Sequence, residues 1–305
     1  SGFNDMASCV SSWRASHSWR TPRPPAPRSP APRTSATCVS SVPVVRPPPS
    51  SLPLALLINL SRRSDRLLAM RRLPWALAWE RVDAIDGRGL SWEQLRADRR
   101  VHRDAIREGE WAEAERVPTI CRKTGSFSPH LTLAAVGCAL SHRLAWERVA
   151  GEASQEWVLI LEDDIDSVCD GFEQQLNKVF AALPSTAQIC FLGYHESTGH
   201  LLQPRASPSL VEIPGQSAIT GLFGYLLHRR GAEALLSSVF PLRYQVDVAV
   251  AVRGWAPGTR YAVSPDAVLI TSPKSEVGRC DTDVQTLGPK GVSAHDRFPT
   301  NMLRL

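Results

Sequence analysis

The chain has 305 residues, of which 43% are apolar, 35 are Lys or Arg and 30 are Asp or Glu. This length suits one large domain or two small ones and can bury a sizeable core. The positive excess belongs to residues 1–50, which hold six Arg and one acid, whereas the rest carries 29 basic and 29 acidic residues. A nucleic-acid binder would carry its basic surface on the folded part, so we expect no nucleic-acid partner.

Local sequence patterns also argue against a membrane-spanning protein and against a zinc-ribbon or disulfide-rich one. The longest apolar run, residues 52–60, has nine residues and contains Pro53, whereas a spanning helix needs about 20. We therefore expect no transmembrane segment in this chain. The seven cysteines include no CxxC pair, which argues against a zinc ribbon or a dense disulfide framework and leaves one or two disulfides open.

The first fifty residues differ in composition from the rest. Ten prolines fall between Thr21 and Ser50, interleaved with Ser, Ala and Arg, and no apolar periodicity accompanies them. Such a segment cannot offset its ordering entropy by burial. We predict a disordered tail or linker over residues 1–50 and a single folded domain over residues 51–305.

From residue 54 onward, strand and helix patterns alternate along the chain. Apolar runs and capping signals predict, in order, strand 54–60, helix 65–73, strand 80–85, a helix opening at 91, helix 131–149, strand 157–161, helix 172–183, strand 189–192, strand 221–227 and helix 230–239. Residues 98–128 are charged and weakly patterned, and we interpret them as a mobile insertion. The alternation predicts an α/β domain with a mainly parallel central sheet flanked by helices.

Three adjacent carboxylates, Glu162, Asp163 and Asp164, directly follow the apolar run 157–161. In open α/β sheets, ligands bind beyond the carboxyl ends of the strands. Neighbouring carboxylates raise one another's pKa unless a cation or a donor neutralises them, and hard divalent cations prefer oxygen ligands. The triplet therefore predicts a metal site serving the departure of a nucleotide diphosphate or phosphoryl transfer. The alternative is a solvated junction between strand and loop.

Other phosphate and nucleophile motifs are absent from the sequence. It contains no GxxxxGK[ST] loop, no GxGxxG after a strand and no GxSxG elbow. These absences argue against P-loop, Rossmann dinucleotide and α/β-hydrolase chemistry.

Six short segments occur in a fixed order between residues 54 and 250. They are INLSRRSDR at Ile58–Arg66, AIDG at Ala84–Gly87, GCALSH at Gly137–His142, LILEDDI at Leu159–Ile165, YLL with a later GA at Tyr225–Ala232, and VD at Val246–Asp247. Together they resemble glycosyltransferase family 25, the lipooligosaccharide-type galactosyltransferases and the related collagen galactosyltransferase domains. Beyond residue 250 the likeness thins, and Cys280–Asp283 is only loosely similar to an acidic segment of the collagen-type members.

The resemblance implies a GT-A-like fold with one nucleotide-sugar-binding domain. It also implies a UDP-sugar donor, most often UDP-galactose, and Mn²⁺ or another divalent cation at Glu162, Asp163 and Asp164, with Asp164 as the direct ligand. Because the products of the family are β-linked, it implies an inverting displacement that needs one carboxylate base, for which Asp247 is the candidate. The acceptor would be a glycan, a lipid-linked saccharide or a collagen-like hydroxylysine.

Eight residues are candidates for the donor pocket. They are Asn59, Arg62, Arg63, Arg66, Asp86, Gly87, Ser141 and His142. Six of them have a structural alternative. The arginines can form a solvated helix face that pairs with Asp65, Asp86 and Gly87 can form a turn, and His142 can be a core histidine.

A catalytically silent relative is the rival interpretation. Such a chain would bind sugar or a partner protein through the same fold, and the intact carboxylate triplet favours the enzyme. The resemblance implies the lumen of the ER or Golgi for a collagen-type member and the cytoplasm for a bacterial-type member.

Overall fold

The computed structural model describes residues 52–119, 130–152, 155–196, 210–213, 219–272 and Val284. The predicted tail over residues 1–50 and the acidic segment at 280–283 lie outside these residues.

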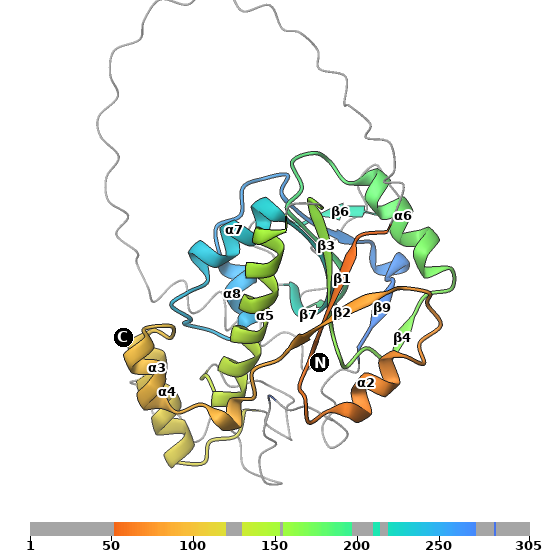
Figure 1. Ribbon diagram of the computed structural model, residues 1–305. Coiled ribbons are helices and arrows are strands. Elements are labelled where there is room, and N and C mark those ends of the chain that lie inside the picture. Colours follow the sequence, from red (N-terminus) through yellow and green to blue (C-terminus); the bar gives the residue numbers. More distant parts are fainter. Residues whose placement is uncertain are drawn as a thin grey trace, which may run out of the picture.

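A seven-stranded sheet forms the centre of the domain, in the order β2-β1-β3-β7-β5-β8-β6 (Figure 1). Its strands are β1 (Leu54–Asn59), β2 (Trp79–Asp83), β3 (Trp157–Glu162), β5 (Ile189–Glu196), β6 (Leu210–Glu212), β7 (Ile219–His228) and β8 (Arg260–Val263). Strands β2, β1 and β3 pair in parallel, while β7 lies antiparallel between β3 and β5. Since β8 is parallel to β5 and β6 antiparallel to β8, only β6 and β7 run against the other five strands. The predicted α/β fold with a mainly parallel sheet is confirmed.

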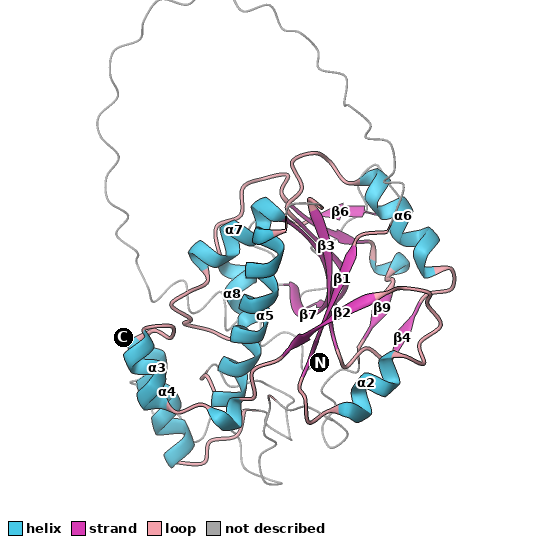
Figure 2. Ribbon diagram, in the orientation of Figure 1, coloured by secondary structure: helices cyan, strands magenta, loops and turns pink. Residues whose placement is uncertain are grey.

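Helices cover both faces of this sheet (Figure 2). On one face lie α5 (Leu133–Gly151), α7 (Arg229–Ser238) and α8 (Val246–Val252), and on the other lie α2 (Ser64–Met70) and α6 (Phe172–Ala182). Alternate residues of β1 serve the two layers: Leu56 and Ile58 join the α5 side, whereas Ala55 and Leu57 join the α6 side. The strand is therefore buried on both faces, which explains its unbroken apolar run.

Smaller elements complete the fold. They are the ribbon β4 (Ser167–Val168) with β9 (Ile270–Thr271) and two 3₁₀ turns, η1 (Gly87–Gly89) and η2 (Pro265–Ala267). Within the described ranges, no helix is long and apolar enough to cross a membrane. Three cysteines fall in those ranges, Cys138, Cys169 and Cys190, and all three are free thiols.

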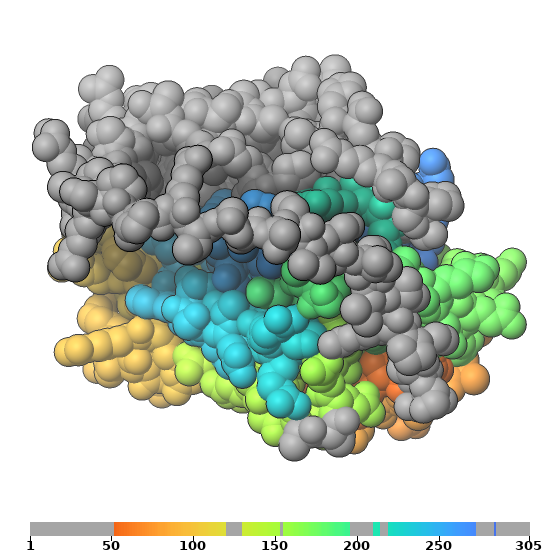
Figure 3. All heavy atoms as spheres, turned by 90° about the horizontal axis from the view of Figure 1, so that it is seen from above, coloured from red at the N-terminus to blue at the C-terminus, as the bar shows by residue number. Residues whose placement is uncertain are grey.

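The interpretation of residues 98–128 as a mobile insertion is wrong over its first part. Residues 103–114 form α4 (Arg103–Ala114), which packs against α3 (Trp92–Asp98). The Trp92 indole lies directly over Gly109, where an added Cβ would come within 2.4 Å of the ring, and its N–H donates to Glu113 at 2.6 Å. The buried face of α4 consists of Ala105, Ile106, Gly109 and Ala112, so it carries one large apolar side chain in a segment rich in charged residues, which hid the helix in the sequence. Both helices lie at the end of the molecule opposite α6 (Figure 3).

Candidate active site

A cavity of about 290 Å³ opens at the carboxyl ends of β1 and β3, beside the N-terminal half of α5. Its walls combine apolar side chains with acidic and basic ones. Nine of the twelve predicted site residues line it, and these are Arg62, Arg66, Asp86, Gly87, Ser141, His142, Glu162, Asp163 and Asp164. Three predicted residues, Asn59, Arg63 and Asp247, are not part of the lining.

One wall of the cavity depends on close backbone contact between α5 and the loop after β2. A Cβ on Gly87 would lie 2.4 Å from the carbonyl oxygen of Leu133, and a Cβ on Gly137 would lie 2.6 Å from that of Ile85. Only glycine permits this approach. Ser141 fastens the same contact, because its hydroxyl donates to the Gly137 carbonyl at 2.7 Å and accepts from the Ile85 N–H at 2.8 Å. Gly87 and Ser141 thus shape the cavity through the backbone.

Asp163 is held by two partners on neighbouring elements. Its Oδ1 accepts from the Arg66 guanidinium at 2.8 Å and its Oδ2 accepts from the Asn59 amide at 2.6 Å. Asn59 is buried, and its own oxygen accepts from Arg81 at 3.0 Å. Burial raises the pKa of Asp163, and the Arg66 charge and the Asn59 hydrogen bond oppose that rise. Both carboxylate oxygens are engaged, so Asp163 orients Arg66 toward the cavity.

Asp164 differs from its neighbour in having an unpaired oxygen. Its Oδ1 is buried and finds no hydrogen-bond partner among the described residues. Burial and the charges of Glu162 and Asp163 raise the pKa of Asp164 to about 7, against the opposing charge of Arg66. A buried carboxylate oxygen without a hydrogen bond is costly. The residues fit a hard divalent cation, which would compensate the charge of Asp164 with Glu162 beside it.

Glu162 ends a hydrogen-bonded chain that starts in the core. The Trp146 indole donates to the Tyr225 hydroxyl oxygen at 2.8 Å, that hydroxyl lies 3.0 Å from His142 Nδ1, and His142 Nε2 lies 2.8 Å from Glu162 Oε1. An indole N–H can only donate, so the Tyr225 oxygen accepts from Trp146. The Tyr225 O–H can then donate to Nδ1 of a neutral imidazole. The His142 proton then sits on Nε2 and points at Glu162. His142 is both a satisfied core histidine and a cavity residue.

The arginines that follow β1 divide between the cavity and the surface. Arg62 bonds Asp86 at 2.7 Å, and Arg88 bonds the same carboxylate at 2.6 Å. These contacts hold the pKa of Asp86 well below its usual range. Arg63 pairs instead with the exposed Asp65 at 2.9 Å, as the structural alternative for this helix expected.

Asp247 lies in the first turn of α8, outside the cavity lining. Its carboxylate accepts from the N–H of Val248 at 2.7 Å and from that of Gly221 at 3.4 Å. Burial raises its pKa, and the nearby charge of Glu162 adds to the rise. Asp247 is therefore close enough to Glu162 for the two carboxylates to interact electrostatically.

Among the cavity residues that the sequence interpretation did not predict, two have titratable side chains. Cys138 lies one helical turn before His142 on α5, and Arg88 follows Gly87 in η1. The signal for Cys138 was its spacing of four residues from His142, which places both side chains on one face of a helix.

The raised pKa of Asp164 predicts how pH changes the stability of the metal-free chain. Between about pH 4 and 7, the unfolded carboxyl (pKa 3.8) ionises while the folded one keeps its proton, so rising pH lowers the unfolding free energy. Asp164→Asn removes this loss. We expect the variant to be more stable than the natural chain at pH 8, by on the order of a few kcal/mol, and equally stable below pH 4. Urea unfolding in EDTA at pH 4, 6 and 8 measures this, and equal stability at pH 8 would contradict it.

The fold is GT-A-like, an α/β sheet with its charged cavity at the carboxyl ends of two adjacent parallel strands. Residues 53–250 match the family described as Glycosyltransferase family 25 (LPS biosynthesis protein). The chain therefore belongs to glycosyltransferase family 25. It is also similar to the Acanthamoeba polyphaga mimivirus protein named "Putative glycosyltransferase R655", with 29% identity over 103 residues. That match covers 32% of this chain and 32% of the viral protein, so the chain spans about a third of the length of this relative.

Proposed function

We propose that this chain transfers a hexose, galactose, from a UDP-sugar to an acceptor hydroxyl with inversion at the anomeric carbon, and that a divalent cation such as Mn²⁺ is required. The observation that carries the proposal is the unpaired, buried Oδ1 of Asp164 in a cavity that also holds Glu162 and two arginines, Arg62 and Arg66. Family membership supports a sugar donor and a glycan acceptor.

Asp164 and Glu162 are the residues that would hold the cation. Once bound, the ion supplies a Lewis acid that stabilises the negative charge on the departing diphosphate. Arg62 and Arg66 line the same cavity and are suited to the phosphate oxygens, because a guanidinium binds phosphate through several N–H groups at once. Asp163 keeps Arg66 in place through the ion pair at 2.8 Å.

Asp247 is the proposed general base. In the displacement, the acceptor oxygen forms a bond to the anomeric carbon as the bond from that carbon to the diphosphate oxygen breaks, and the hydroxyl proton passes to a carboxylate. Burial of Asp247 supports this role, because the resulting rise in its pKa makes its carboxylate a stronger base than an exposed one. The proposed acceptors are a glycan, a lipid-linked saccharide or a collagen-like hydroxylysine.

The proposal is tested by sugar transfer with the full chain. UDP-galactose and other UDP-sugars are incubated with each acceptor class in Mn²⁺ or in EDTA, and UDP release and glycosylated product are measured. We expect product only with the cation. Asp247→Asn should lower kcat about 10²- to 10⁴-fold while its affinity for UDP stays unchanged.

The matched control is Asp266→Asn, which changes an exposed aspartate in η2 and should leave kcat unchanged. Unchanged turnover in Asp247→Asn would refute the assigned base. A folded chain that binds UDP without turning over any donor would instead support a catalytically silent sugar-binding module.

A further inference from the structure

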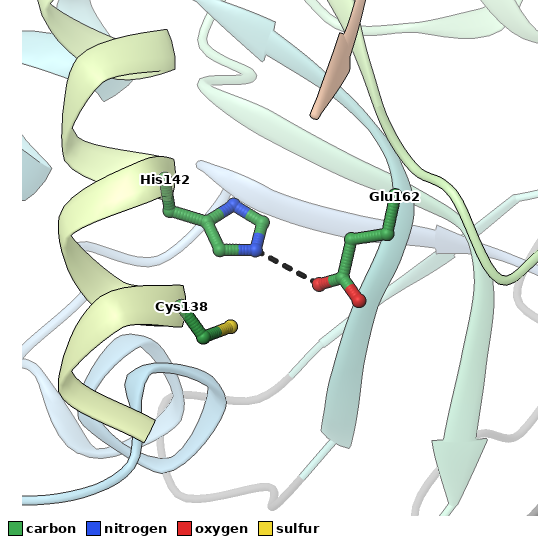
Figure 4. A group of neighbouring side chains, drawn as sticks. All are labelled: Cys138, His142 and Glu162. Carbon is green, nitrogen blue, oxygen red and sulfur yellow. Dashed lines mark hydrogen bonds and ion pairs between the residues drawn. The ribbon is translucent and has the colours of Figure 1, made fainter. Parts of the chain in front are cut away.

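Three side chains of different ligand chemistry converge at the inner wall of the cavity (Figure 4). A sulfur from Cys138, a ring nitrogen from His142 and a carboxylate oxygen from Glu162 all lie within 4.8 Å of one another. The shortest of these separations is 2.8 Å, between His142 Nε2 and Glu162 Oε1. Thiolate, imidazole and carboxylate are the three ligand types that zinc takes in proteins.

The scaffold beneath these ligands is rigid. Cys138 and His142 lie four residues apart on α5, so one helix face presents both toward the end of β3. That helix is anchored by the fully buried Trp146 and by the close approach of Gly137 to the loop after β2.

Four carboxylates surround the thiol and favour a cation beside it, those of Glu162, Asp247, Asp164 and Asp163. Burial, the largest cause, and these charges together raise the pKa of the Cys138 thiol. His142 also has the outer partner that metal-binding histidines use, because its Nδ1 faces the Tyr225 hydroxyl at 3.0 Å. With Nε2 bound to an ion, Nδ1 would carry the proton, and the Tyr225 oxygen has two lone pairs to accept from both His142 and Trp146.

We infer that Cys138, His142 and Glu162 form a site for a borderline divalent ion of the Zn²⁺ type, with its fourth position open to the cavity that all three residues line. The ligand set separates this site from the one proposed at Asp164, since sulfur and imidazole select zinc-like ions whereas Mn²⁺ and Mg²⁺ favour oxygen. Binding displaces the Cys138 proton to solvent and leaves the thiolate on the ion. Because Glu162 belongs to both ligand sets, the two ions would compete for it.

Cobalt provides a direct test that needs no enzymatic activity. Co²⁺ is added to the metal-free full chain, and the near-ultraviolet charge-transfer absorption of a cobalt–thiolate bond is recorded, followed by displacement with Zn²⁺. We expect the band to saturate at one ion per chain and to disappear when Zn²⁺ is added. Cys138→Ser should abolish the band and weaken Zn²⁺ binding by at least about 100-fold.

Matched variants separate this site from other thiols and from the proposed donor site. Cys169→Ser removes a half-buried cysteine in the loop before α6 and should keep the band, as should Asp164→Asn. A band that survives in Cys138→Ser, or no band in the folded natural chain, overturns the inference. If Cys138→Ser fails to fold, His142→Gln replaces it as the test. Loss of the band in a folded His142→Gln chain supports the site, and an unchanged band overturns it. Failure here leaves Mn²⁺-dependent UDP binding untouched, so the two proposals fail independently.

Discussion

Asp164→Asn is expected to abolish the Mn²⁺-dependent binding of UDP. The natural carboxylate has a buried oxygen without a partner in the described structure and lies beside Glu162 in the cavity. An amide keeps the shape of this side chain and removes its charge, so the cation loses its main anionic ligand. Isothermal titration of UDP into the chain with Mn²⁺ or EDTA should show affinity at least about 100-fold weaker in the variant.

The matched control for this change lies two residues away. Asp166 has the same chemistry, but it is exposed and bonded to the Thr271 hydroxyl at 2.5 Å, outside the cavity lining. Asp166→Asn should therefore bind UDP as the natural chain does. Mn²⁺-dependent UDP binding that persists in Asp164→Asn would show that the cation is held elsewhere.

Asp163→Ala is expected to lower the unfolding free energy by about 3–5 kcal/mol. The change removes the carboxylate that Arg66 contacts at 2.8 Å and the acceptor that Asn59 contacts at 2.6 Å, both in a nearly buried setting. Removing one member of a buried ion pair leaves the other charge uncompensated. Chemical denaturation at pH 7, followed by circular dichroism, measures the difference.

An ion pair whose acidic member is exposed provides the comparison. Asp65 contacts Arg63 at 2.9 Å, nearly the same separation, but the Asp65 side chain is 65% exposed while that of Arg63 is 12% exposed. Asp65→Ala should lower stability less than Asp163→Ala, because solvent screens the charge of Asp65. If the Asp163 and Asp65 variants lose equal stability, the buried pair does not carry the structural role assigned to it.

Together with the pH prediction, these changes distinguish two adjacent carboxylates by their partners. Removing Asp163 breaks its contacts with Arg66 and Asn59, whereas metal-free Asp164 keeps an unpartnered oxygen and destabilises the fold above pH 7. A binding site with a buried carboxylate oxygen that only a ligand would satisfy lowers the stability of the ligand-free fold. The sequence shows three adjacent carboxylates of similar chemistry, and the fold gives each of them different hydrogen-bond partners.

Much of the architecture was predictable because local patterns and packing agree. The run at 54–60 became β1 because both of its faces are buried, and the run at 157–161 became β3 beside it. Helix α4 was missed because its buried face, made of Ala105, Ile106, Gly109 and Ala112, has one large apolar side chain in a segment rich in charged residues. Its packing depends on Trp92, a residue from another helix, which no local pattern can show.

The sequence by itself determined the order of most strands and helices as far as α7, the family and the placement of the carboxylate triplet at a strand end. These features follow from short-range periodicity and from contiguous motifs. Only the tertiary structure decided which carboxylate is paired, because Asn59 and Arg66 reach Asp163 from about a hundred residues away along the chain. It also brought Cys138 and His142 against Glu162. Burial and long-range partners set the charge state of each group, and both arise only when distant segments pack together.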